Sequence, residues 1–135
     1  MDKNKFIQIK KEHAREILYL LLNSKEEFSV IAYLKAISFS PTLPKHIIEN
    51  FDEAILFMFA NYTLQSANIK DDNLIFETGF GKENFGSIVT IPLTNIIQIV
   101  QNNTSLFINP FANIITNTPK NPFLKNPKNN KFLKN

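Results

Sequence analysis

The chain of 135 residues contains no cysteine, which removes disulfides, thiol catalysis and zinc–thiolate sites together. Nothing in its composition ties the protein to an oxidising compartment. Long apolar runs are also missing, because the longest, residues 17–22 and 54–60, are far shorter than the roughly 20 residues that span a bilayer. The first residues show no apolar segment followed by a small-residue cleavage site, so they do not indicate a secretory signal. We expect a cytoplasmic protein with no membrane segment.

Arginine is almost absent, and lysine is unevenly distributed. Arg15 is the one arginine of the chain, and five of the 15 basic residues lie between positions 120 and 134. The remaining 10 bases stand against 12 acids, so residues 1–119 are mildly acidic. A nucleic-acid-binding face needs lysine and arginine on a folded surface, interleaved with aromatic residues. We therefore do not expect a nucleic-acid partner, although the pI is about 9.1.

The residue patterns that support catalysis are missing as well. His13 falls in the first turn of a predicted helix, and His46 lies beside prolines. The carboxylates at 52–53 and 71–72 are sequence neighbours, which point apart on a strand or belong to turns. The sequence Gly79-Phe80-Gly81 lacks the Lys-Ser/Thr that follows in a phosphate-binding loop. We expect a protein that is not an enzyme and that holds no cofactor and no metal.

Residues 10–23 have the pattern of an amphipathic helix. One apolar stripe follows the spacing i, i+3, i+4 and i+7, in the order Ala14, Ile17, Leu18 and Leu21. Further apolar residues, at 19, 20 and 22, widen this stripe beyond what one packing face uses. Either a small sheet covers the whole helix, or a partner chain covers the second stripe.

The rest of the chain has the patterns of short strands. Predicted strands lie at 28–37, 54–60, 74–80, 87–91, 95–100 and 106–108. The segment 54–60 is a continuous apolar run, as in a buried strand, and Pro92 indicates a sheet edge or a corner. One helix followed by about six strands predicts a mainly β protein, either a small open antiparallel barrel or a pair of curved sheets.

The strand at 74–80 ends in two glycines and has one face made of Leu74, Phe76, Thr78 and Phe80. Gly79 and Gly81 have two explanations. They mark a bulge or a turn at the strand end, or they leave a strand without side chains that a bound extended peptide approaches closely. The apolar side chains at 76, 80, 106 and 107 either line a groove for that peptide or belong to the core.

The chain closes with NPFLKNPKNNKFLKN, residues 121–135, which contains two copies of Phe-Leu-Lys-Asn and no acid. So little apolar content does not offset the entropy of ordering, which predicts a flexible segment. We expect a folded domain over residues 1–112 and a basic tail over 113–135. The tail is either a tether whose Phe-Leu pairs anchor it to a partner, or a product of codon composition without a role.

The run NLIFETGFGKENFGSIVTIPLTNIIQIVQNNTSLFINPF, residues 73–111, resembles the stringent starvation protein B family, the adaptors that deliver tagged substrates to the ClpXP protease. The similarity rests on Phe80-Gly81, on the stretch 89–93 and on Leu106-Phe107, and the order of elements extends it upstream to residue 14. It implies a Sm-like, SH3-type open barrel that forms a homodimer through its N-terminal helix. It also implies a hydrophobic groove for the ssrA tag, which ribosome rescue adds to unfinished proteins.

The resemblance implies a role for several residues. The tag-binding strand and pocket would contain Phe76, Thr78, Gly79, Phe80, Leu106 and Phe107. The dimer helix would use Ile17, Leu18, Leu20 and Leu21. Docking to the N-terminal domain of the ClpX unfoldase would use Phe132, Leu133 and Lys134, with Phe123, Leu124 and Lys125 as a second copy. Partners would be ssrA-tagged peptides or unfolded client proteins, and the alternative is a Sm-like RNA-binding protein that uses the basic tail.

Overall fold

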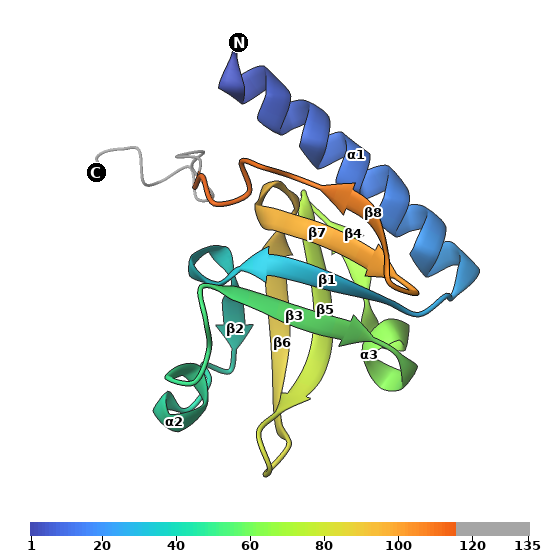
Figure 1. Ribbon diagram of the computed structural model, residues 1–135. Coiled ribbons are helices and arrows are strands. Elements are labelled where there is room, and N and C mark those ends of the chain that lie inside the picture. The colour runs from blue at the N-terminus through green and yellow to red at the C-terminus, as the bar shows by residue number, and fades with distance from the viewer. Residues whose placement is uncertain (116–135) are drawn as a thin grey trace.

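The computed structural model describes residues 1–115, which form a long N-terminal helix and two four-stranded antiparallel sheets (Figure 1). Sheet A has the strand order β3-β1-β7-β8, and sheet B has the order β2-β6-β5-β4. The two sheets enclose the core between their inner faces and do not close into a barrel. The prediction of a mainly β fold with an N-terminal helix is confirmed, and the pair of sheets is the alternative observed.

Helix α1 spans Lys3–Ser24 and begins seven residues before the predicted start. Asp2 caps it, since its carboxylate accepts the backbone N–H groups of Asn4 at 3.0 Å and Lys5 at 3.2 Å. Ile7 is buried and extends the predicted apolar stripe by two turns. The sequence pattern hides this extension because lysines interrupt it, yet the long stem of Lys10 brings its ammonium to 5.1 Å from the ring of Phe107. No helix within residues 1–115 has the length and apolar character needed to cross a membrane.

The strands divide between the two sheets as follows. Sheet A consists of β1 (Phe28–Tyr33), β3 (Ala54–Phe59), β7 (Ile96–Gln101) and β8 (Thr104–Ile108). Sheet B consists of β2 (Ser38–Ser40), β4 (Asn68–Lys70), β5 (Asn73–Phe80) and β6 (Phe85–Pro92). Two short helices, α2 (Lys45–Ile48) and α3 (Asn61–Ser66), lie in connections where the sequence predicted none.

The chain changes sheets at two corners. The predicted strand 28–37 is wrong as a single element, because the 3-10 turn η1 (Leu34–Ala36) ends β1 and leads the chain into β2 of the other sheet. The second corner follows Pro92, where η2 (Leu93–Asn95) leads from β6 in sheet B to β7 in sheet A. The corner predicted at Pro92 is confirmed. The first corner contains no Gly or Pro and therefore left no signal in the sequence.

The segment 54–60 is not the buried strand that its continuous apolar run predicted. β3 is an edge strand of sheet A in which buried and exposed positions alternate. Ile55, Phe57 and Phe59 point into the core, while Leu56 and Met58 are exposed. An apolar run does not distinguish a strand covered on both faces from one whose outward residues are apolar as well.

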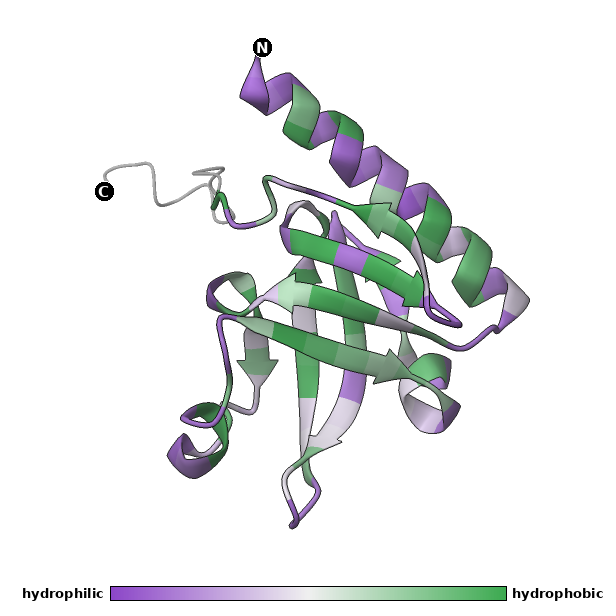
Figure 2. Cartoon of the chain, in the orientation of Figure 1, coloured by the Kyte–Doolittle hydropathy of each residue, from purple (hydrophilic) through white to green (hydrophobic). Residues whose placement is uncertain are grey.

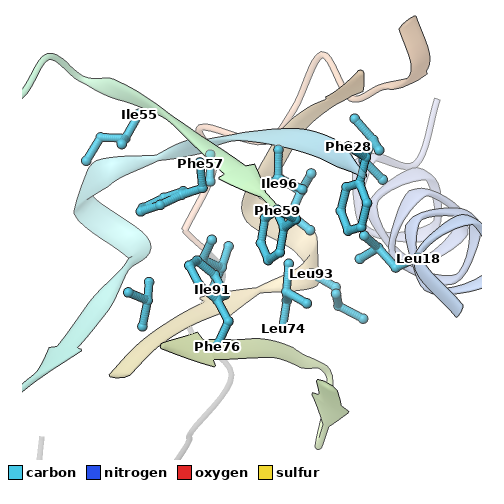
Figure 3. Close-up of a cluster of buried hydrophobic side chains, with 14 of the residues drawn as sticks. Leu18, Phe28, Ile55, Phe57, Phe59, Leu74, Phe76, Ile91, Leu93 and Ile96 are labelled. Atoms are coloured by element: carbon cyan, nitrogen blue, oxygen red, sulfur yellow. The ribbon is translucent and has the colours of Figure 1, made fainter. Parts of the chain in front are cut away.

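The core lies where the two sheets meet, and α1 borders it on one side, beside Leu18 (Figure 3). The ring of Phe76, from β5, lies with its centroid 5.2 Å from that of Phe57 and 4.6 Å from that of Phe59, both from β3. Phe28 stacks on Phe59 at 4.7 Å, and Leu18 of α1 is fully buried beside this cluster. Aromatic contacts between β3 and β5 therefore join the two sheets.

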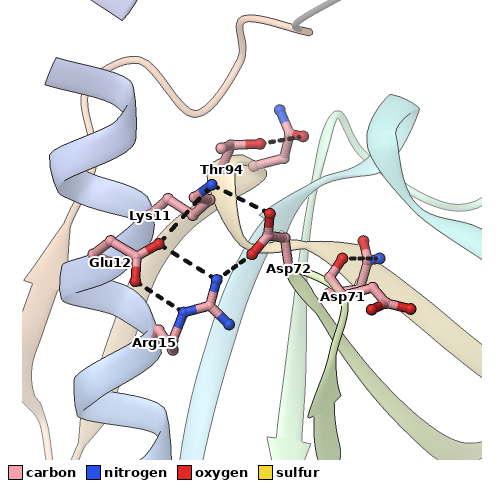
Figure 4. A network of polar contacts seen from close by, with 8 residues as sticks. Lys11, Glu12, Arg15, Asp71, Asp72 and Thr94 are labelled. Carbon is pink, nitrogen blue, oxygen red and sulfur yellow. Dashed lines mark hydrogen bonds and ion pairs between the residues drawn. The ribbon is translucent and has the colours of Figure 1, made fainter. Parts of the chain in front are cut away.

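A polar network attaches α1 to the turn between β4 and β5 (Figure 4). Arg15 donates to the carboxylates of Glu12 and Asp72, and the Lys11 ammonium lies 3.2 Å from Asp72 Oδ2. The hydrogen bond from Arg15, followed by that from Lys11, lowers the pKa of the Asp72 carboxyl, against the opposing effect of burial. Asp71 and Asp72 both have positive φ, so the turn predicted there is confirmed.

The end of the folded body is fastened by two buried asparagines. The side-chain N–H groups of Asn95 donate to the carbonyls of Ala112 at 2.8 Å and Ile114 at 3.1 Å. Asn109 likewise donates to the carbonyl of Thr94 at 3.2 Å. These bonds hold the segment after β8 against η2, so the folded body continues to residue 114, slightly beyond the predicted boundary at 112.

Candidate functional site

A pocket of about 660 Å³ extends across sheet B from the end of β2 to the first turn of α3. Its lining includes Pro41 after β2, residues 60–63 at the start of α3, and the parts of β5 and β6 nearest their connecting hairpin. Thr78 and Gly79 of the predicted peptide-binding strand line this pocket. The structure therefore brings two of the predicted residues to a concave surface.

The pocket contains a pair of glycines that face each other across two strands. Gly79 of β5 and Gly86 of β6 are register partners, so they share one face of the sheet. A Cβ added at Gly86 would meet no atom within 4 Å, whereas one added at Gly79 would lie 1.7 Å from Asn84 Oδ1. The backbone at Gly86 is thus open, while the Asn84 side chain occupies the space beside Gly79.

The two glycines singled out in the sequence play different parts. Gly81 lies in the hairpin with a φ of 71°, so its explanation as a turn residue is confirmed. Gly79 lies within β5 and has no positive φ. Its missing side chain makes room for the Asn84 side chain, so the bare backbone on the pocket surface is that of Gly86.

One edge of β5 is open beside the pocket. β4 pairs with β5 only as far as Ile75, and the next outward-directed N–H, that of Glu77, donates to Ser66 Oγ at 2.9 Å. Backbone groups alternate between the two sides of a strand, so those of Gly79 point to the same side as those of Glu77, away from β6. No other strand within residues 1–115 pairs at that position. This edge therefore offers an N–H and a C=O group to an added strand.

The charge of the pocket comes from one side chain. Among the described residues that line it, Glu77 alone carries a charge, and no lysine or arginine is present. The Tyr62 hydroxyl donates to Glu77 Oε1, and this hydrogen bond raises the pKa of Tyr62 above its usual value. The contact connects the first turn of α3 to β5 at the rim of the pocket. Nowhere in residues 1–115 do three or more His, Asp or Glu side chains gather in a way that would hold a metal ion.

The remaining residues predicted to line the groove lie elsewhere, and the prediction is corrected for them. Phe76 and Phe80 point from β5 into the core, with 1% and 9% of their surface exposed. Leu106 and Phe107 belong to β8 of the other sheet, where Phe107 is buried against His13 of α1 and Leu106 is half-buried against the core. The inner face of each strand is covered by the opposite sheet or by α1, so these side chains do not reach the pocket.

The pocket residues that sequence reasoning missed include Pro41, Tyr62, Glu77, Asn84 and Gly86. For Gly86 a signal was present, because the strand at 74–80 and the strand after it form a hairpin through a short turn. Drawing that hairpin in register would have placed Gly86 opposite Gly79. Tyr62 lies on a helix that the sequence did not predict, so nothing linked it to Glu77.

The predicted dimer helix is covered on one side only. Leu18 and Leu21 are buried against their own chain and Ile17 is half-buried, so the prediction that all four residues face a partner is corrected. Leu20 remains 66% exposed, and Ile9 on the same helix is 64% exposed. The alternative in which the sheets cover the whole helix is therefore wrong, and a helix-mediated dimer stays a prediction.

The predicted docking residues at 123–125 and 132–134 lie outside the described part of the chain. Comparisons with protein-family models, with curated proteins and with solved structures find no match for this chain. The resemblance to the stringent starvation protein B family therefore remains a prediction that rests on the residues quoted for it.

Proposed function

We propose that this protein is a cytoplasmic, non-enzymatic adaptor that binds extended peptides at the Gly79–Gly86 pair, with the ssrA degradation tag as the peptide that the family resemblance indicates. The observation that carries the proposal is a pocket in which bare backbone lies beside an open strand edge. These two features together suit a peptide that adds a strand to β5.

In this arrangement the peptide backbone pairs with the outward groups of Gly79. Side chains of the peptide alternate toward and away from the pocket, and the absence of a side chain at Gly86 leaves room over the sheet face for those that point toward it. Such binding needs no bond to be made or broken. Affinity comes from main-chain hydrogen bonds, and selectivity comes from the shape and charge of the lining.

The second part of the proposal is delivery through the C-terminal segment, and it rests on sequence alone. The motif Phe132-Leu133-Lys134 would dock on the ClpX N-terminal domain while the pocket holds the client. A coil of the length of residues 113–135 has a root-mean-square span of about 25–30 Å. Tethering over such a span corresponds to effective concentrations on the order of millimolar, so two weak contacts give useful avidity.

The test of the pocket is fluorescence anisotropy with a labelled degradation-tag peptide. Gly86→Val should raise the dissociation constant by about tenfold or more, a loss of about 1.4 kcal/mol in binding, because its methyl groups enter the part of the pocket, over the sheet face, that a peptide side chain would occupy. Folding should persist, since nothing lies within 4 Å of the added Cβ. Thr90→Val is the matched control, because Thr90 lies on the same face of β6 and does not line the pocket. Equal affinity of the Gly86→Val and wild-type proteins would show that the peptide does not bind at this pocket.

A salt series in the same assay separates peptide capture from the RNA-binding alternative. Phosphate contacts lose affinity steeply as salt rises, whereas main-chain pairing and apolar contacts do not. The absence of lysine and arginine from the described lining of the pocket favours the peptide. Tighter binding of a labelled single-stranded RNA than of the tag, with a steep salt slope, would instead support the alternative.

Deleting residues 132–135 tests delivery. The truncated protein should bind the tag peptide with unchanged affinity and should no longer stimulate degradation of a tagged protein by ClpXP. Undiminished stimulation would show that these residues do not dock on the unfoldase.

A further inference from the structure

The two sheets have four edge strands, and three of them are protected against pairing with another chain. β2 and β4 contain only three residues each, and short strands are weak templates. β8 lies alongside α1, with Phe107 against His13 (Figure 1). The fourth edge, β3, has neither form of protection.

β3 presents the features of an edge that pairs. Its six residues, Ala-Ile-Leu-Phe-Met-Phe, include no charged residue, no proline and no glycine, and its pairing with β1 is regular without a bulge. Within residues 1–115 no strand pairs with its other side. Leu56 and Met58 point outward with 54% and 71% of their surface exposed. A monomer with such an edge would be prone to aggregate.

The outer face of sheet A, like the exposed side of β3, carries no charged side chain in its two central rows. The register aligns one row across all four strands, formed by Leu56, Ile31, Gln98 and Ile108. The next row begins at Met58 and ends at Ser105, and neither row contains a charged side chain. An antiparallel sheet with one face in water normally alternates apolar and polar residues, so this face differs from a surface built for solvent alone.

We propose that β3 pairs antiparallel with β3 of a second copy of this chain, across a two-fold axis. The pairing joins the two A sheets into one of eight strands. Two identical strands that run in opposite directions are self-complementary, which a closed dimer requires. Leu56 and Met58 of each copy become cross-strand neighbours of the same residues on the other copy, and each shields the other from water.

The charges around β3 favour this geometry. Asp52 and Glu53 lie just before the strand, and the segment after it begins with uncharged Ala60 and Asn61. Antiparallel pairing separates the two acidic ends by about 20 Å at ~3.4 Å per residue, about two and a half times the Debye length of physiological salt. Parallel pairing would bring the four carboxylates together. A peptide of arbitrary sequence would offer neither the apolar match nor this separation.

The dimer is independent of the proposed peptide site. The lining of the pocket includes no residue of β3, although it includes Ala60, the residue that follows β3. The open edge that would receive the peptide belongs to β5. Each dimer would present two pockets. The dimer also differs from the one that the family resemblance implies, which uses α1.

Sedimentation equilibrium of the full chain tests the proposal. The wild type should be a dimer, and Leu56→Lys/Met58→Lys should raise the dimer dissociation constant by about tenfold or more, because lysines would face lysines across the two-fold. Both residues are exposed, so the variant should keep the wild-type circular dichroism spectrum. Ile9→Lys/Leu20→Lys is the matched control on the exposed side of α1 and should leave the dimer intact. Amide hydrogen exchange should be slow in the wild type and fast in the β3 variant for the amides of β3 that point away from β1.

Three results would overturn the proposal. They are a wild type that stays monomeric, dissociation by the α1 variant, and a dimer that survives the two lysines in β3. Binding of the labelled tag peptide should be the same in all three proteins. Loss of peptide binding in the β3 variant alone would assign β3 to the client and would likewise overturn the dimer. Failure of every protein to bind the peptide would count against the pocket and leave the dimer measurement unaffected.

Discussion

The outer faces of the two sheets differ in chemistry although the sheets have the same number of strands. In sheet A the rows that start at Leu56 and Met58 are uncharged, and β1, β3 and β7 are mostly hydrophobic along their length (Figure 2). In sheet B the strands β5 and β6 become less hydrophobic toward their hairpin, where the Gly79–Gly86 pair lies. The first face suits a lasting contact through side chains, and the second suits a contact led by backbone atoms.

The largest expected effect comes from breaking the contact that holds the two sheets together. Phe76→Ala should lower the free energy of unfolding by about 3–5 kcal/mol, because it empties a site packed between Phe57 and Phe59. Urea denaturation measures this loss. Thr78→Ala, on the same inward side of β5 but only half-buried, should cost less than about 1 kcal/mol. Equal losses at the two positions would show that the aromatic contact does not join the sheets.

A smaller effect is expected at the corner where the chain passes from sheet B to sheet A. Asn95→Ala should lower the free energy of unfolding by about 1–3 kcal/mol, since the carbonyls of Ala112 and Ile114 lose their donor. Protection of residues 109–114 against hydrogen exchange should fall with it. Asn113→Ala provides the control, because Asn113 is exposed. Unchanged protection in the Asn95 variant would contradict the role given to this side chain.

The glycine pair should respond unequally to substitution. Gly79→Ala should lower the free energy of unfolding by about 1 kcal/mol, because the new methyl group displaces the Asn84 side chain. Gly86→Ala should lower it by nothing measurable, since the space there is open. Adding Asn84→Gly to Gly79→Ala should recover most of the loss in thermal denaturation, because glycine removes the displaced side chain and tolerates the φ of 54° at that position. A Gly86→Ala protein as unstable as Gly79→Ala would mean that the pocket is not open there.

The smallest expected effect concerns the network between α1 and sheet B. The folded-state pKa of Asp72 is lowered by its hydrogen bonds, so its contribution to stability is present above the unfolded pKa near 4 and disappears as pH falls through the folded value. Asp72→Asn should therefore lower the free energy of unfolding at pH 7 by about 0.5–1 kcal/mol, a range set by the exposure of the pair. The difference from wild type should shrink toward pH 2 and in high salt. A stability difference between Asp72→Asn and wild type that does not change with pH would show that Asp72 acts through the conformation of the turn and not through its charge.

Much of the fold could be predicted from patterns among neighbouring residues in the sequence. The alternation along residues 74–80 placed Leu74, Phe76 and Phe80 on one face of the strand, and the structure shows that this is the inner face of β5. Asn102 and Asn103 lie in the turn before β8, and both have the positive φ that asparagine adopts more readily than most residues. The candidate site was harder to predict from the sequence. The role of Gly79 depends on Gly86, its partner across the hairpin, and on the Asn84 side chain that lies beside it, and both follow from the hairpin register.

The sequence by itself determined where the helix stripe lies, where most turns fall and which residues of each strand share a face. Those properties follow from the periods of helix and strand, which act over a few neighbouring residues. Only the tertiary structure decided that 54–60 is an exposed edge, that Phe107 is buried and that β5 is open beside α3. These properties depend on which distant segment packs on which face. The local sequence around an apolar side chain does not determine whether its own chain or another chain will cover it.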